Sequence, residues 1–196
     1  MQLENLTIGG QTNGSSKIAG GILELRAKPK TDWFFNPSDL SRKDEVIVAS
    51  TTVNSPVFSL SARVSVDFAS PYDGGVIYVK ASDDSWAKLA FEFSAERKPT
   101  IVSVVTRMIS DDCDGPSHPE DHVWLRIYCD AKTLAFHYSA DGKYWRFIRW
   151  FSIPYIERRP IEIGFGAQSP TGEGSAARFA DIRFGTATIE NIRNGE

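Results

Sequence analysis

Ten short segments of alternating apolar and polar residues follow one another from residue 45 to residue 185, and this pattern constrains the fold more than any other feature. Turn-forming residues separate the segments. The Asp141-Gly142 pair is a strong hairpin signal, because both residues tolerate the backbone angles of a tight turn. Short strands with regular turns are typical of antiparallel sandwiches and barrels. The segments that we expect to be strands are 45–50, 57–68, 75–81, 86–94, 100–109, 122–130, 133–139, 144–151, 161–167 and 177–185.

The length of 196 residues suits one large β-sandwich, and no linker divides the chain. A further short strand is expected over 22–26, and the charged stretch 38–45 is expected to be a loop. Residues 9–21 are rich in Gly, Ser, Thr and Asn, which are typical of loops. We therefore predict a flexible N-terminal arm over 1–21 and a single all-β domain over 22–196, with almost no helix.

The charge pattern and the hydropathy exclude several classes of protein. The formal net charge is −3, and the charges are interspersed, without the basic stripe that nucleic-acid binding needs. No segment approaches the length of about 20 apolar residues that spans a membrane, and the first residues lack a secretion signal. We expect a soluble, cytoplasmic protein that binds neither nucleic acid nor membrane. In a reducing compartment, Cys113 and Cys129 are expected to stay free rather than form a disulfide.

Alternation along each strand sorts the side chains into an apolar face and a mixed face. The strand over 86–94 buries its apolar set and leaves polar and aromatic residues on the other side, and the strands over 122–130, 133–139 and 161–167 divide in the same way. If these strands are neighbours in one curved sheet, their mixed faces form a concave ligand-binding surface. The alternative is a polar face that is merely solvated, which is common in antiparallel sheets. The residues predicted to bind a ligand are Trp86, Lys88, Glu92, Trp124, Arg126, His137 and Gln168.

Catalytic alternatives find less support in the sequence. A glycoside hydrolase needs two carboxyl groups on either side of the scissile bond. Glu92 has no acidic partner on its own strand, although Asp111, Asp112 or Glu173 could approach from loops. Without a nucleophile elbow, nucleophilic serine catalysis is not expected, and neither is a nucleotide-binding loop.

Metal and cofactor binding are also weakly supported. The stretch 118–122 holds four potential ligands, but its proline-bearing loop has no evident rigidity, so a solvated loop is the better interpretation. The acidic loop over 111–114 lacks the spacing of a calcium-binding loop. We expect no cofactor and no catalytic residue, and the sequence leaves adventitious calcium binding by this acidic loop open.

Several motifs, in a fixed order from about residue 20 to residue 185, resemble the regulation-of-enolase family, formerly a domain of unknown function. They include Thr31-Asp32-Trp33, Trp86-Ala87-Lys88, Trp124-Leu125-Arg126, the 139–145 hairpin and Gln168-Ser169-Pro170. The resemblance implies a concanavalin A-like jelly roll of the lectin and glucanase superfamily. It also implies a cytoplasmic, non-enzymatic protein connected with regulation of the glycolytic enzyme enolase. The chain departs from the family pattern after Ser110-Asp111, where it is acidic rather than aromatic.

Three functional hypotheses follow. In the first, a sugar or a phosphorylated metabolite stacks on Trp86 or Trp124 and is hydrogen-bonded by the polar members of the mixed face. In the second, the protein contacts enolase or its regulators directly through exposed aromatic residues, for which Trp33, Tyr72 and Trp150 are the candidates. In the third, the protein is a glycosidase that depends on Glu92.

Overall fold

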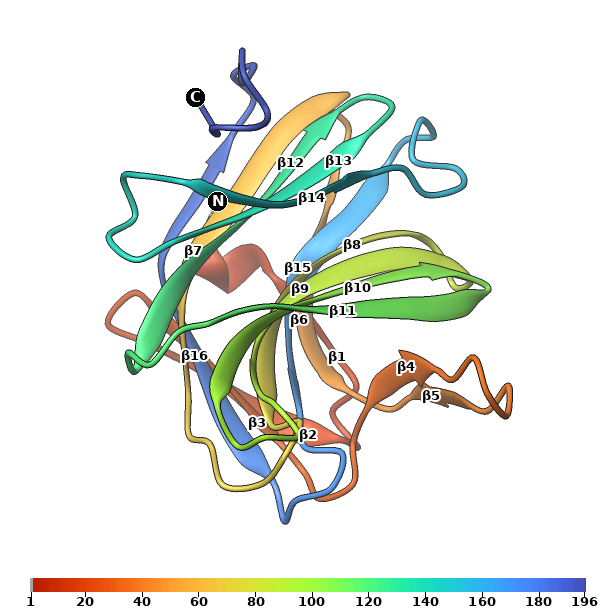
Figure 1. The fold of residues 1–196 in the computed structure, drawn as a ribbon, viewed down its shortest axis with the longest axis vertical. Helices are drawn as coiled ribbons and strands as arrows, with labels where there is room; N and C mark the ends of the chain where they lie inside the picture. Colours follow the sequence, from red (N-terminus) through yellow and green to blue (C-terminus); the bar gives the residue numbers. More distant parts are fainter. Residues whose placement is uncertain (1) are drawn as a thin grey trace.

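The computed structural model describes residues 2–196, and nearly all of its regular structure is antiparallel β-sheet (Figure 1). Two seven-stranded sheets pack face to face. We name each after a strand that carries candidate residues. The β9 sheet has the order β1 (Thr7–Gly9), β6 (Ile47–Val53), β15 (Ile161–Gln168), β8 (Gly74–Ser82), β9 (Ser85–Phe93), β10 (Pro99–Arg107) and β11 (Ile109–Ser117).

The second sheet, the β12 sheet, has the order β14 (Arg146–Phe151), β13 (Leu134–Ser139), β12 (His122–Asp130), β7 (Val57–Val66), β16 (Ser175–Gly185), β3 (Ile22–Ala27) and β2 (Gly14–Ala19). A small hairpin of β4 (Trp33–Phe35) and β5 (Arg42–Asp44) stands beside the β9 sheet in Figure 1. A single turn of 3-10 helix, η1 (Leu3–Asn5), precedes β1. Within residues 2–196, no helix combines the length and apolar character that a bilayer-spanning helix needs.

The core lies between the two sheets and is built from the alternating apolar residues that the sequence pattern picked out. On β12, for example, Val123, Leu125, Ile127 and Cys129 are all inaccessible to solvent. Alternate side chains of the inner strands point inward, so each sheet contributes one apolar face to the interior. The all-β antiparallel sandwich is therefore confirmed, and each of the ten segments from 45 to 185 contains a strand.

Three predicted irregular regions differ from the structure. Residues 7–9 pair with β6, and residues 14–19 pair with β3, so the stretch predicted as a flexible arm supplies an edge strand to each sheet. Met1 lies outside the described residues. The charged stretch 38–45 contains β5, and the acidic loop after residue 109 is the edge strand β11. Edge strands tolerate polar and glycine-rich sequences because one of their sides has no strand partner, so the apolar alternation that reveals inner strands is missing.

A second apolar cluster lies on the outer face of the β9 sheet. The β4–β5 hairpin folds over this face and packs Trp33 and Phe35 against Trp86. The backbone N–H of Phe35 also donates a hydrogen bond to Ser110 Oγ on β11, at 2.9 Å. The outer face is therefore only partly open, and the hairpin forms one wall of the hollow described next.

Candidate ligand-binding site

The seven predicted ligand-binding residues do not share one face. Trp86, Lys88 and Glu92 lie on β9 and Gln168 lies on β15, all in the β9 sheet. The other three lie on β12 and β13, in the opposite sheet. The prediction of a single concave surface is therefore wrong. Alternation assigns a side chain to one of the two faces of its own strand, but it does not tell which sheet the strand joins.

Trp86 is buried and offers no ring face to a ligand. Its indole stacks on Trp33, with ring centroids 4.4 Å apart and an interplanar angle of 27°, and Phe35 meets it edge to face at 5.6 Å. The predicted stacking role of Trp86 is therefore wrong. The prediction that Trp33 is an exposed contact residue is wrong for the same reason, because the two tryptophans cover each other.

Lys88, Gln168 and Glu92 form a buried hydrogen-bonded chain on the outer face. Lys88 Nζ donates to the Trp33 carbonyl at 2.6 Å and to Gln168 Oε1 at 2.7 Å, and Gln168 Nε2 donates to Glu92 Oε2 at 3.2 Å. Gly74 on β8 pairs with Gln168 of β15 on one side and with Glu92 of β9 on the other. Because glycine has no side chain, the amide can cross β8 and reach the carboxyl group. Gln168 on β15 thus joins two residues of β9 that lie 80 and 76 positions before it in the sequence.

Burial changes the protonation of this network. The pKa of the Glu92 carboxyl is raised to about 8: burial raises it most, the positive charge of Lys88 lowers it, and the nearby charges of Asp32, Asp114 and Asp112 raise it. Burial also lowers the pKa of the Lys88 ammonium group. At neutral pH Glu92 is therefore largely a neutral carboxylic acid that is able to donate a proton or a hydrogen bond.

Lys88 and Glu92, the two ends of this hydrogen-bonded chain, line a pocket of about 550 Å³ between the hairpin, β10, β11 and the loops before β8 and after β15. Pockets of this volume suit small ligands. Asp112 and Asp114 alternate on β11, so their side chains lie on one face, and Asp112 is in the same cross-strand row as Lys88. The lining residues are Asp32, Phe34, Asn36, Lys43, Tyr72, Lys88, Glu92, Ser94, Ala95, Val102, Val104, Asp112, Asp114, Pro170 and Thr171.

Of the carboxyl groups that the sequence suggested as partners for Glu92, only Asp112 lines this pocket. Asp111 lies on the other face of β11 and forms an ion pair with Arg149, and Glu173 lies near Lys30. Asp32 and Asp114 also line it, although the sequence suggested neither as a partner for Glu92. The position of Asp114 could have been inferred only by recognising β11 as a strand, because the i, i+2 spacing then places Asp114 beside Asp112.

The three predicted residues of the β12 sheet have different surroundings. Arg126 and His137 are register partners, and the C-terminal segment 186–196 covers both of them. Burial lowers the pKa of Arg126 to about 10 and that of His137 to about 4, so the first is charged and the second is neutral at pH 7. Trp124 is half-buried, and the turn at Gly142 approaches its ring closely. The pocket that Lys88 and Glu92 line does not include these residues.

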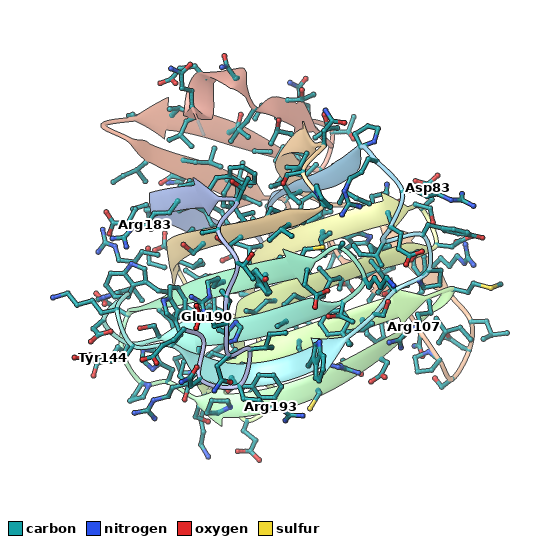
Figure 2. All side chains as sticks on the ribbon, turned by 90° about the horizontal axis from the view of Figure 1, so that it is seen from above. Asp83, Arg107, Tyr144, Arg183, Glu190 and Arg193 are labelled. Carbon is teal, nitrogen blue, oxygen red and sulfur yellow. The ribbon has the colours of Figure 1, made fainter. Side chains whose placement is uncertain are left out.

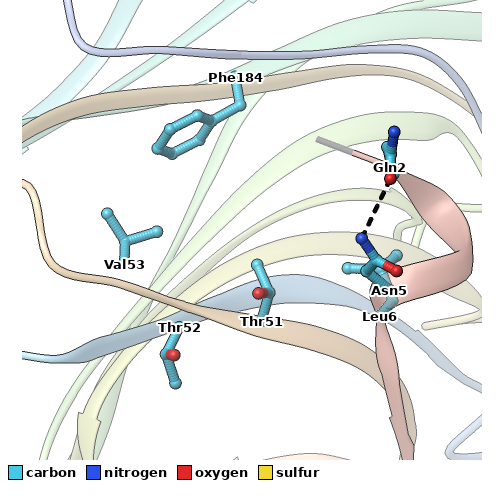
Figure 3. A pocket seen from close by; sticks show the side chains of 7 residues that line it. All are labelled: Gln2, Asn5, Leu6, Thr51, Thr52, Val53 and Phe184. Carbon is cyan, nitrogen blue, oxygen red and sulfur yellow. Dashed lines mark hydrogen bonds between the residues drawn. The ribbon is translucent and has the colours of Figure 1, made fainter.

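A second hollow, at the N-terminal end of the sandwich, has a different character (Figure 3). Its volume is about 260 Å³, and none of the described residues that line it has an ionisable side chain. Its lining consists of Gln2, Asn5, Leu6, Thr51, Thr52, Val53 and Phe184. It offers neither the charged groups nor the buried network of the larger pocket.

Metal binding has no support in the described part of the chain. Across residues 2–196, no three His, Cys, Asp or Glu side chains are grouped so that they could hold a metal ion. In the stretch 118–122, His118 Nε2 pairs with the carbonyl of His122, and the His122 ring pairs with the Asp121 carboxylate.

The two packed seven-stranded antiparallel sheets define the fold class as a concanavalin A-like β-sandwich. Within that class, the chain belongs to the family described as protein of unknown function DUF1349, whose model matches residues 11–187. No sequence among the curated proteins matches the chain.

Solved structures share the fold at low sequence identity. A functionally unknown protein from Saccharomyces cerevisiae has a TM-score of 0.87 at 22% identity, and the match covers 96% of this chain and 100% of that one. The GH43 BlXynB protein from Bacillus licheniformis has a TM-score of 0.65 at 14% identity, with 88% of this chain and 38% of that chain covered. Lectin I-B4 from Griffonia simplicifolia, in its metal-free form, has a TM-score of 0.56 at 13% identity, with 93% of each chain covered. The chain thus spans well under half of the GH43 protein and most of the other two.

Proposed function

We propose that the protein binds a saccharide, neutral or carrying an amino group, in the pocket on the outer face of the β9 sheet. The observation that carries this proposal is the buried chain of Lys88, Gln168 and Glu92 at a pocket of about 550 Å³ that aromatic side chains also line. Binding sites fix orientation with a few well-held polar groups in an otherwise apolar hollow. The network meets this requirement, because each of its members is held by hydrogen bonds before a ligand arrives.

The chemistry of the lining suits hydroxyl groups. A sugar hydroxyl both donates and accepts hydrogen bonds, so it is served by ionised carboxylates as acceptors and by the protonated Glu92 as a donor. Phe34 and Tyr72 add aromatic surface to the lining, and Tyr72 is 40% exposed. Aromatic rings of this kind stack on the C–H face of a sugar ring.

The charge of the pocket favours a neutral or cationic sugar over a phosphorylated metabolite. Three aspartates line it, Asp32, Asp112 and Asp114, and the lysines that line it are Lys43 and Lys88. Lys88 already donates to two acceptors within the protein. A phosphate dianion would therefore enter a region of net negative charge.

Relatives in structure are consistent with this proposal without establishing it. Solved structures that share the fold are named as a lectin and as GH43 glycoside hydrolases. Their sequence identities of 15% and 13% restrict the comparison to the fold. The proposal therefore depends on the pocket itself.

The test is calorimetric titration of the purified protein with a panel of neutral sugars, amino sugars and sugar phosphates. Asp112→Asn removes one carboxylate from the pocket, and Asp111→Asn removes its chain neighbour, which faces away. We expect the first variant to bind at least about tenfold more weakly and the second to match the wild type, since a charged hydrogen bond contributes about 1.5–3 kcal/mol. Binding of no sugar, or equal loss in both variants, would refute the proposal.

A second candidate is glycoside hydrolysis, and the protonation of the pocket favours it. A glycosidase pairs a protonated carboxyl group, which donates to the leaving oxygen, with an ionised one. Glu92 has the raised pKa of such an acid, and Asp32, Asp112 and Asp114 line the same pocket. Release of reducing ends from oligosaccharides by the wild type, abolished in Glu92→Gln, would establish hydrolysis. Binding without product would leave the binding function alone.

The connection with enolase regulation stays a prediction from the sequence resemblance. Of the aromatic residues expected to contact a partner, Tyr72 and Trp150 are exposed, whereas Trp33 is not. Trp150 lies on the edge strand β14, away from the pocket of the β9 sheet. Direct contact predicts that the wild type and Asp112→Asn capture purified enolase, whereas Trp150→Ala does not.

A further inference from the structure

The C-terminal segment 186–196 crosses the outer face of the β12 sheet, opposite the proposed saccharide pocket. Figure 2 shows Glu190 and Arg193 on this segment as it passes over the strands. The segment is tied to the sheet by three hydrogen bonds. The Ile189 N–H donates to Tyr128 Oη at 3.3 Å, His137 Nε2 donates to the Ile192 carbonyl at 2.7 Å, and Arg126 Nη2 donates to the Gly195 carbonyl at 2.9 Å.

Beneath this segment lies a buried positive charge with no negative partner. Arg126 is 8% exposed, and no carboxylate in the described part of the chain lies within ion-pairing distance of it. Its guanidinium group rests on the Trp145 ring at 4.2 Å, and its Nε has no hydrogen-bond partner. A buried cation is expected to be paired, because taking it out of water is costly. Arg126 therefore has unused capacity for an anion.

His137 adds a second unused group beside it. It is the register partner of Arg126, it is inaccessible to solvent, and its Nδ1 has no partner. Since Nε2 carries the proton that is donated to the Ile192 carbonyl, Nδ1 holds a free lone pair. That lone pair accepts a hydrogen bond from a protonated oxygen, such as the hydroxyl of a phosphate monoanion.

We propose that Arg126 and His137 form a binding site for an oxyanion, and that residues 191–196 cover it, with the Ile192 and Gly195 carbonyl groups standing where oxygens of the anion would bind. Arg193 holds the cover in place, with its guanidinium carbon 4.8 Å from the Phe147 ring centroid and 5.9 Å from that of Trp150. The site lies on the sheet that does not carry the saccharide pocket. Its test is therefore independent of the proposed function.

Competition between cover and ligand makes the proposal measurable. A ligand whose site is open only part of the time binds with an apparent affinity reduced by the open fraction. Any substitution within residues 191–196 that weakens the cover, and leaves Arg126 and His137 themselves in the chain, must therefore tighten anion binding. Gly195 offers such a change, since a Cβ at this position would lie 2.4 Å from Arg126 Nη2 and 2.8 Å from Trp145 Cβ.

The experiment is titration with inorganic phosphate, and separately with acetate, at constant ionic strength, followed by tryptophan fluorescence. Gly195→Ala opens the cover, and Gly21→Ala is its matched control. Both glycines have positive φ, 78° and 76°, but a Cβ at Gly21 meets nothing within 4 Å. We expect Gly195→Ala to bind phosphate about tenfold more tightly than the wild type and Gly21→Ala to match the wild type. Adding Arg126→Gln to Gly195→Ala should abolish the gain.

Each outcome decides the proposal. A response to phosphate alone assigns the site to phosphoryl groups, and a response to both anions assigns it to oxyanions in general. Equal affinity in Gly195→Ala and Gly21→Ala, or a gain that survives Arg126→Gln, overturns it. If Gly195→Ala does not fold, Arg193→Ala replaces it, because that change removes the stacking contact with the aromatic rings without adding atoms. Phosphate affinity unchanged from the wild type in Arg193→Ala likewise overturns the proposal.

Discussion

The wild type is expected to lose stability as the pH rises from 5 to 8, and replacement of Glu92 by glutamine is expected to remove most of this loss. Glutamine has nearly the same shape, keeps an oxygen that accepts from Gln168 Nε2, and cannot ionise. In the wild type, burial raises the pKa of Glu92 from 4.5 to about 8. Between those two values the folded protein holds a proton that the unfolded chain has released, so the folded state loses free energy relative to the unfolded state as pH rises.

The magnitude follows from the two pKa values. A carboxyl group with a pKa of 4.5 in the unfolded chain and about 8 in the folded protein destabilises the fold by about 1 kcal/mol at pH 5 and by about 4 kcal/mol at pH 8. We therefore expect the stability gap between Glu92→Gln and the wild type to widen by about 3 kcal/mol between pH 5 and pH 8. Other titrating groups are common to both proteins and cancel in the difference.

The assay is urea unfolding of both proteins at several pH values from 5 to 8, with the free energy of unfolding extrapolated to water. Glu96→Gln, an exposed substitution near the end of the same strand, is the control and should track the wild type. Parallel stability curves for Glu92→Gln and the wild type, within about 0.5 kcal/mol across this range, would refute the reasoning. They would mean that Glu92 is ionised in the folded protein and that the network is more hydrated than the structure shows.

Three further outcomes are expected. Lys88→Met leaves two buried acceptors unpaired and should lower the free energy of unfolding by about 2–4 kcal/mol. Lys98→Met, its control at an exposed ion pair, should lower it by less than about 0.5 kcal/mol. Equal losses of stability in the two variants, measured by urea unfolding, would contradict this prediction. Trp33→Ala removes the ring stacked on Trp86 and should lower the free energy of unfolding by about 3–5 kcal/mol. It should also weaken the near-ultraviolet circular dichroism, and an unchanged spectrum would count against the stack. Only one thiol should react with a thiol reagent in the folded protein, because Cys113 is exposed while burial shields Cys129 and raises its pKa; rapid reaction of both would disprove this.

The buried network explains how a sheet face can be both apolar and chemically specific. The β4–β5 hairpin excludes water from the Trp86 side of the face, and the network begins where that cover ends. The Trp33 backbone carbonyl belongs to both regions, since its residue stacks on Trp86 and its oxygen accepts from Lys88. Displacement of the hairpin would therefore disturb the pocket as well as the apolar cluster.

The strands and their faces could be predicted from the sequence, because alternation is a local property that each strand displays by itself. The inward residues of β12 and β15, for example, are buried as the pattern predicts. The pairing of strands is not local. Lys88 and Arg126 belong to similar alternating segments, yet β9 and β12 lie in opposite sheets, so one predicted face became two separate regions.

The candidate site depended on tertiary structure for the same reason. Lys88, Glu92 and Gln168 were predicted as polar residues of a mixed face, but only the register across Gly74 joins them into one network. The cover over Arg126 comes from residues near the C-terminus, at a sequence separation of 69 residues, and no local pattern indicates it. The sequence alone thus determined which side chains of each strand point into the core. The tertiary structure decided which of the remaining side chains come into contact, because strand pairing and loop placement minimise the free energy of the whole chain rather than of any one segment.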